Sequence, residues 1–178
     1  MSIKSVVCMT LLSILVACTK TDSDYSKREL VLSQSNLNAL PLDLGAYKNL
    51  KRLYVDANQL KEIPQSTFSN LKSLEELDLS YNQLTSLPDN IAKATQLELL
   101  DLSNNAFEAL PKGVLALKNL KTLNIRNNKI KVLPEEIKYL DKLEIIYLAG
   151  NALDPNQRAL YRSWLPRTKF IWAEIKSE

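Results

Sequence analysis

The sequence predicts a solenoid, a stacked array of short repeats, because two residue types recur in step along most of the chain. A proline that directly follows leucine or isoleucine returns every 23 or 24 residues, and an asparagine returns at the same interval. A period of this length is typical of an array in which each unit contacts only its neighbours. The prolines are Pro41, Pro64, Pro88, Pro111 and Pro134, and the asparagines are Asn58, Asn82, Asn105, Asn128 and Asn151.

Each repeat is expected to begin with a short strand. In Leu77-Asp78-Leu79 two apolar residues flank a polar one, so both leucines point to one buried face. The apolar residues that follow are too irregularly spaced for a helix and predict turns that fold inward. The asparagine amide offers a donor and an acceptor to backbone groups that a buried turn leaves unpaired. Proline fixes φ where the strand-side segment ends. We therefore expect both recurring residues to have structural roles.

The complete unit is clearest between Leu74 and Pro88. Its pattern, LxxLxLxxNxLxxLPxxIxxLxx, resembles the short leucine-rich repeat, and the resemblance covers roughly residues 27–172. The resemblance implies an α/β, right-handed solenoid with a parallel β-sheet on the concave face and short turns or 3₁₀ segments on the convex face. About six repeats would occupy residues 27–153, the first with Ser35 in place of asparagine. Arrays of this kind usually bind other molecules and seldom catalyse.

One repeat is a residue longer than the others. Four steps separate Pro64 from Phe68, where three separate Pro88 from Ile91, and Phe68 takes the isoleucine position. We expect a one-residue bulge on the convex side.

The pattern ends after Asn151, and residues 154–178 predict a cap. Asp154-Pro155 is a helix N-cap followed by proline at the first helical position. Behind it, the pairs Leu160 with Trp164 and Tyr161 with Leu165 predict one apolar stripe on a short helix. Residues 168–172 predict a last strand, as leucine-rich repeats of this type often have. We interpret Trp164, Phe170 and Trp172 as cap residues rather than a ligand pocket.

The first residues indicate an export signal. Lys4 precedes a largely apolar stretch over residues 5–17, which is too short to span a bilayer. Leu15-Val16-Ala17-Cys18 resembles the lipobox of bacterial lipoproteins, which implies cleavage of residues 1–17 and lipidation of Cys18. Residues 18–26 would then form a polar tether, and Thr19 favours the outer membrane. The alternative is an ordinary secretory peptide.

Composition argues against several function classes. The chain has no histidine and only three glycines, which removes histidine-based triads and glycine-rich phosphate loops. Residues 18–178 hold 22 basic and 20 acidic residues, too small an excess for nucleic-acid binding through a basic face. Asp78 and Asp101 are expected about 4.8 Å apart on adjacent strands, where they could bind a cation, although the family often has aspartate there. We expect no enzyme activity, cofactor or metal.

A partner is expected on the strand side chains that point away from the core. Aligned repeats place these side chains in three rows, and Leu99, Ile145 and Tyr147 are apolar where polar residues are usual. The alternative is that such substitutions have no consequence. The candidate protein-binding residues are Tyr54, Asp78, Leu99, Asp101, Asn124, Arg126, Ile145 and Tyr147.

Two functions remain open at this stage. The first is a lipid-anchored module of the bacterial envelope that binds a protein or peptide through its concave sheet. The second is a structural envelope protein that binds glycan or cell wall. Glycan sites usually need aromatic platforms, and only Tyr54 and Tyr147 offer them, far apart in the stack. The sequence therefore favours protein binding.

Overall fold

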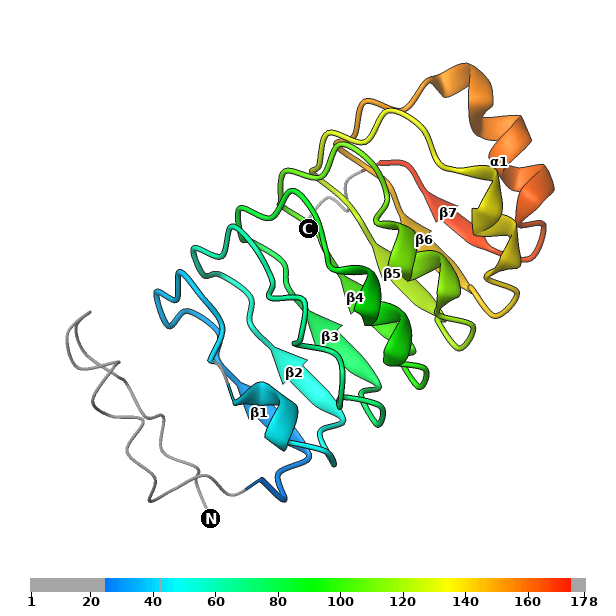
Figure 1. The fold of residues 1–178 in the computed structure, drawn as a ribbon. Coiled ribbons are helices and arrows are strands. Elements are labelled where there is room, and N and C mark those ends of the chain that lie inside the picture. The colour runs from blue at the N-terminus through cyan, green and yellow to red at the C-terminus, as the bar shows by residue number, and fades with distance from the viewer. Residues whose placement is uncertain (1–24, 42, 174–178) are drawn as a thin grey trace, which may run out of the picture.

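The computed structural model describes residues 25–41 and 43–173, and in this part of the chain seven short strands form one parallel sheet. The strands lie side by side in chain order, so each repeat adds one strand beside the last (Figure 1). This arrangement confirms the predicted α/β solenoid. The strands are β1 Glu29–Val31, β2 Arg52–Tyr54, β3 Glu76–Asp78, β4 Leu99–Asp101, β5 Thr122–Asn124, β6 Ile145–Tyr147 and β7 Lys169–Ile171.

Short 3₁₀ helices lie on the side opposite the sheet. Three of them begin directly after the repeating prolines Pro88, Pro111 and Pro134, whose φ angles lie between −59° and −70°. Proline is restricted to φ near −65°, so it fixes the chain direction where each helix begins. The helical elements are η1 Leu44–Ala46, η2 Asp89–Lys93, η3 Lys112–Ala116, η4 Glu135–Tyr139, η5 Pro155–Gln157 and α1 Arg158–Trp164.

The core is a column of aliphatic side chains between the sheet and these helices. The central strand leucines pair in register, Leu77 with Leu100 and Leu100 with Leu123, and all three are fully buried. Burying a leucine stabilises a protein by about 1.5–3 kcal/mol. A single repeat cannot shield its own leucines, so this energy is available only when repeats stack.

The 24-residue repeat has the expected extra residue after Pro64. Residues 65–68 form turns instead of a 3₁₀ helix, and the Thr67 N–H donates to the Pro64 carbonyl at 3.0 Å. Phe68 is buried where the other repeats place an aliphatic residue. The larger side chain thus fills the core position from a longer turn.

The recurring asparagines join neighbouring repeats. In Asn82, Oδ1 accepts the Leu60 N–H of the preceding repeat at 3.0 Å, and Nδ2 donates to the Val55 carbonyl of that repeat at 3.0 Å. The same Nδ2 also donates to the Leu79 and Ser80 carbonyls of its own repeat. The equivalent bonds recur at Asn58, Asn105, Asn128 and Asn151. These asparagines are structural, as predicted.

The residue before each of these positions lies in the left-handed region of φ. Asn104 and Asn127 have φ of 54° and 53°, and Gly150 has φ of 69°; these residue types tolerate such angles. Ala57 and Tyr81, with φ of 52° and 51°, do not, and the left-handed conformation costs such residues roughly 1–2 kcal/mol. The turn therefore imposes the conformation whichever residue occupies it.

The C-terminal cap forms as a helix and a strand. The Asp154 side chain accepts the Asn156 N–H at 2.9 Å, which confirms the N-cap, and β7 confirms the last strand. Tyr161 is fully buried and its hydroxyl accepts the Leu133 N–H at 3.3 Å.

The predicted apolar stripe of α1 is only partly correct. Tyr161 and Leu165 are buried, but Leu160 is 46% exposed. A seven-residue helix turned to bury Tyr161 cannot direct the adjacent residue 160 into the same core. The aromatic cap residues do gather, with the rings of Phe170 and Trp172 stacked 5.6 Å apart.

At the N-terminal end, the Tyr25 ring packs edge-on against Tyr47 at 5.0 Å. Leu30 lies in β1, the edge strand of the described sheet, and is half-buried. Among the described residues no helix is long and apolar enough to cross a bilayer. The predicted signal peptide and Cys18, together with most of the tether, lie outside the described residues.

Candidate protein-binding face

The sheet face that points away from the core is the candidate site, and we call it the concave face. It holds three rows of side chains, with one residue from each repeat in a row. The first row comprises Glu29, Arg52, Glu76, Leu99, Thr122, Ile145 and Lys169, and the second comprises Val31, Tyr54, Asp78, Asp101, Asn124, Tyr147 and Ile171. The third row lies two residues beyond the second, and it is less exposed than the sequence predicts, because Ser80, Ser103 and Ala149 are buried.

Four predicted site residues form one connected network. The Asn124 Nδ2 donates to Asp101 Oδ2 at 2.7 Å, and Asn124 Oδ1 accepts from Arg126 Nε at 3.3 Å. The Arg126 guanidinium lies over the ring of Tyr147, 5.1 Å from its centroid. Such stacking contributes about 0.5–1 kcal/mol at exposed sites. The network fixes the position of Arg126 from two sides.

Asn124 has a different role from the one predicted for it. The residue is 7% exposed, and its amide bonds to Asp101 and Arg126. Asn124 is therefore a positioning residue, which orients Asp101 and Arg126, and the partly exposed residues of the network include Arg126 and Tyr147.

Asp78 and Asp101 lie opposite each other on β3 and β4, as predicted. Each accepts a backbone N–H two residues on, from Ser80 and Ser103, at 2.8 Å. Burial raises the pKa of Asp78, and the nearby charges of Asp101 and Asp56 raise it further, against the lowering effect of the bonds from Ser80. The Asp78 carboxylate is thus held in an environment that disfavours its negative charge.

The N-terminal part of the face is polar and internally paired. The Tyr54 hydroxyl donates to Glu76 Oε2 at 2.7 Å, and burial together with this bond raises the pKa of Tyr54 to about 12. Arg52 Nε forms an ion pair with Glu29 Oε2 at 2.7 Å. Tyr54 is therefore a fixed, protonated residue, and the residue as a whole is partly exposed.

The predicted apolar residues lie in the first row. Leu99 is 36% exposed, and Ile145 is half-buried two strands away, with Thr122 between them in register. Sequence reasoning identified these residues, but not the ion pairs of the first strands or the stacking of Arg126 on Tyr147. The alignment of the repeats places Arg126 and Tyr147 in adjacent repeats and neighbouring rows. Such diagonal neighbours are within reach of long side chains, so their contact could have been predicted.

Comparison with known proteins assigns the family. A leucine-rich repeat family model matches residues 48–107 and 95–153. The chain belongs to the leucine-rich repeat family.

Relatives and solved structures agree with this assignment. The human leucine-rich repeat-containing protein 3C is 42% identical over 64 residues, covering 36% of this chain and 22% of that protein. An Arabidopsis thaliana receptor kinase ectodomain, solved in complex with Casparian strip integrity factor 2, is 33% identical with a TM-score of 0.65, covering 72% of this chain and 16% of that one. An internalin of Listeria monocytogenes shares the fold, with 23% identity, a TM-score of 0.66 and coverage of 82% and 41%. This leucine-rich repeat chain spans less than half the length of the curated relatives it matches.

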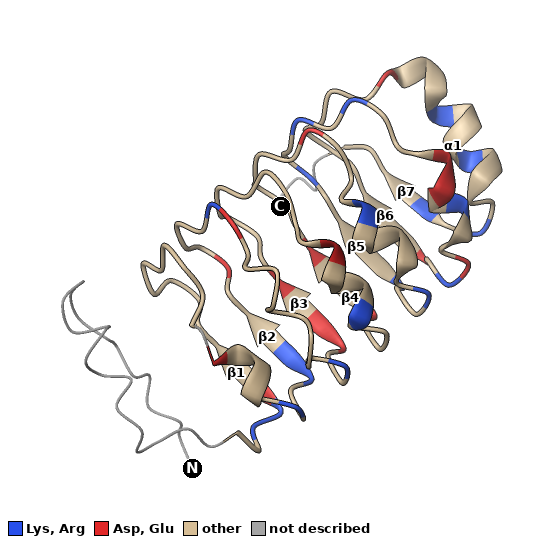
Figure 2. Ribbon diagram, in the orientation of Figure 1, with Lys and Arg blue, Asp and Glu red and all other residues tan. Residues whose placement is uncertain are grey.

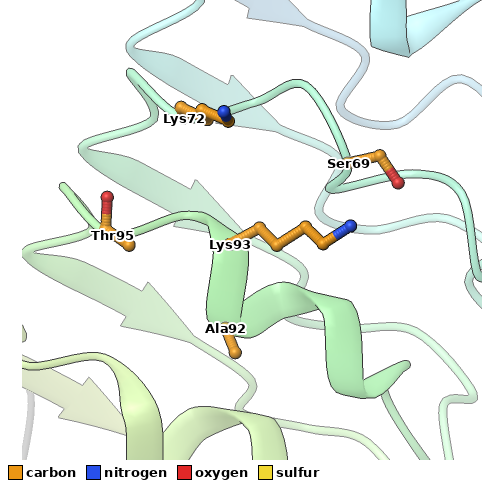
Figure 3. A pocket seen from close by; sticks show the side chains of 5 residues that line it. All are labelled: Ser69, Lys72, Ala92, Lys93 and Thr95. Carbon is orange, nitrogen blue, oxygen red and sulfur yellow. The ribbon is translucent and has the colours of Figure 1, made fainter.

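The convex side of this leucine-rich repeat protein has an open hollow between two turns. It is lined by Ser69, Lys72, Ala92, Lys93 and Thr95 (Figure 3). Beside it, Asn90 Nδ2 donates to Ser69 Oγ at 3.2 Å. The charged residues of its lining are Lys72 and Lys93.

The convex lysines make mainly local contacts. Lys118 Nζ donates to the Tyr139 carbonyl at 2.9 Å, and Lys138 pairs with Glu135 at 2.7 Å. Among the described residues no group of three acidic, histidine or cysteine side chains is placed to hold a metal ion. Members of the leucine-rich repeat family are typically interaction modules without enzyme activity.

Proposed function

We propose that this protein is a non-enzymatic interaction module of the bacterial envelope, which is anchored by lipid at Cys18 and binds a protein or peptide on its concave face. The observation that carries the proposal is the fixed pair of Arg126 and Tyr147, on the same face as the exposed Leu99. Arginine and aromatic residues held in place are the usual anchors of protein interfaces. The Arabidopsis ectodomain, with a factor bound to it, supports protein recognition by this fold.

The lipid anchor rests on the Leu15–Cys18 lipobox and the apolar segment before it. A lipidated chain would be held at a membrane surface, and Thr19 after the lipidated cysteine favours the outer membrane. Stable anchoring requires more than one acyl chain. Labelling with an alkyne-bearing fatty acid should mark the wild-type protein and not Cys18→Ser. Labelling that persists in Cys18→Ser would contradict the anchor.

The concave face is tested by photocrosslinking on intact cells. A photoreactive phenylalanine at Tyr147 keeps an aromatic ring there, and the same residue at Lys118 on the convex side is the control. We expect one dominant protein adduct from position 147, absent from position 118 and lost in a variant with Leu99→Ser added. Equal adducts from both positions would refute the concave site.

Binding to glycan or cell wall is the alternative. Tyr54 and Tyr147, the tyrosines of the second row, are four strands apart, about 19 Å at normal strand spacing, which is too far for one sugar to contact both. Retention of the protein by purified cell wall, without any protein adduct at position 147, would favour this alternative.

A further inference from the structure

The concave face is divided by charge along the solenoid axis. From β1 to β4 its three rows carry five acidic residues and one arginine, and from β5 to β7 they carry Arg126 and Lys169 with no acidic residue. Figure 2 shows red on β3 and blue on β7. A face with such a dipole favours a partner of the opposite arrangement.

Three aspartates of the acidic part have only neutral hydrogen-bond partners. Asp56 accepts from the Ser33 hydroxyl, Asp78 accepts from the Ser80 N–H, and Asp101 accepts from the Asn124 amide. In the described part of the chain none of the three is in an ion pair, whereas Glu29 is paired with Arg52. These three carboxylates therefore remain available to a cation from outside the chain.

Arg126 is the matching cationic group. Its Nε bonds to Asn124 and its plane stacks on Tyr147, which leaves the Nη atoms without a hydrogen bond to any residue that the structure describes. A guanidinium edge held in this way is suited to bidentate binding of a carboxylate. Because the side chain is already ordered, little conformational entropy is lost when a ligand binds.

We propose that the concave face binds an extended peptide segment of a partner protein, with a carboxylate of the segment on Arg126 and a lysine or arginine of the segment on Asp78 and Asp101. This inference rests on the proposed function and names the chemistry of its partner. Asp78 and Arg126 are two strands and one row apart, about 12 Å between Cα atoms at normal sheet spacings. An extended peptide covers that distance in about four residues, and residues i and i+4 point to the same side. The segment therefore carries opposite charges four positions apart.

The exposed Leu99 completes the site. Leu99 lies on β4, between the strands of Asp78 and Arg126, and it is exposed beside the Asp101 strand position. Leu99 is in the first row, one row from Asp101 and two rows from Arg126, so an apolar side chain of the segment beyond its basic residue contacts Leu99, which adds affinity without changing the charge requirement.

The test uses a random 12-residue peptide library displayed on phage and selected on the protein. We expect enriched peptides to carry an acidic and a basic residue four positions apart, and to bind at least about tenfold more weakly to Arg126→Gln and to Asp78→Asn. Asp78→Asn keeps the oxygen that accepts the Ser80 N–H, so this variant retains the local fold. Lys118→Gln and Asp89→Asn on the convex side are the matched controls, and circular dichroism verifies folding of all four variants.

The outcomes separate the inference from the proposed function. Peptides that lose binding with Leu99→Ser but show no charge pattern and tolerate Arg126→Gln would overturn the inference while leaving the concave site in place. Peptides that bind all concave variants equally, or no enrichment over an empty surface, would overturn both. A charge pattern that is unaffected by Asp78→Asn and Arg126→Gln would also overturn the inference, because it would locate the charges elsewhere.

Discussion

The asparagine ladder allows a stability prediction at the level of single hydrogen bonds. Asn82→Ala removes four bonds, but their loss has unequal consequences. The three carbonyl groups keep another donor each: Val55 from Asn58, Leu79 from Asn105, and Ser80 from the Ala57 N–H. The Leu60 N–H, in contrast, has Asn82 Oδ1 as its acceptor and lies at a fully buried residue. Asn82→Ala thus leaves one buried donor without a partner.

The expected cost follows from this count. A buried, unpaired donor costs about 1–3 kcal/mol, and each of the other lost bonds adds a smaller amount, so Asn82→Ala should lower the free energy of unfolding by about 3 kcal/mol. Asn82→Asp keeps the acceptor for Leu60 but turns a second oxygen toward three carbonyl oxygens. It should therefore be at least as destabilising at neutral pH and recover as the pH falls, because the protonated acid can donate.

Urea unfolding followed by circular dichroism measures these changes, with Asn70→Ala at an exposed position as the control. We expect the control to lie within about 0.5 kcal/mol of wild type. If Asn82→Ala loses less than about 1 kcal/mol at an unchanged m-value, the ladder does not satisfy the Leu60 N–H in the way described.

Three further changes test other parts of the structure by the same unfolding assay. Ala57→Gly should stabilise by about 0.5–1 kcal/mol because it relieves a φ of 52°, whereas Ala94→Gly, at a φ of −78°, should destabilise; equal effects would contradict the strain argument. Gly113→Ala should cost about 1–3 kcal/mol, since its Cβ would lie 2.6 Å from Ile91 Cγ2; an unchanged midpoint would refute this packing. Asp78→Asn should stabilise the protein at neutral pH, because the pKa of Asp78 is raised in the folded state and stability therefore falls as the pH rises from the unfolded pKa through the folded pKa. The difference between variant and wild type should vanish well below about pH 4. A wild type that is more stable than the variant at neutral pH would contradict the raised pKa.

Much of the fold was predictable because each repeat has the same sequence pattern and therefore the same local structure. The L-x-L pairs gave the strands to within a residue, and the recurring asparagines marked the positions where backbone groups need side-chain partners. The left-handed residues were harder to predict. Gly150 and Asn127 favour that conformation, but Tyr81 does not, so the signal emerges only when the repeats are aligned.

The candidate site was predictable as a set of positions, but not as a set of contacts. Alignment placed Asp101, Asn124 and Tyr147 in one row, because parallel strands pair in register. The exposure of each residue in this row depends on the contacts that neighbouring side chains make with it. Asn124 is buried, and the long Arg126 side chain bonds to it. The outward position of Leu160 has a similar origin, since a short helix can bury only the residues on one side.

Each repeat uses different residues for its framework and for the concave face, so the concave face can change in sequence while the fold is kept. Leu77 and Asn82 are buried and bonded to neighbouring repeats, so their replacement affects stability across repeat boundaries. Arg126 follows β5 on the concave face and is partly exposed, and its side chain bonds to the Asn124 side chain. Changes at Arg126 should therefore alter binding with little effect on unfolding, whereas changes at Asn82 should alter unfolding first. A variant of Arg126 that destabilised the protein as much as Asn82→Ala would show that the concave network is part of the structural framework rather than a binding surface.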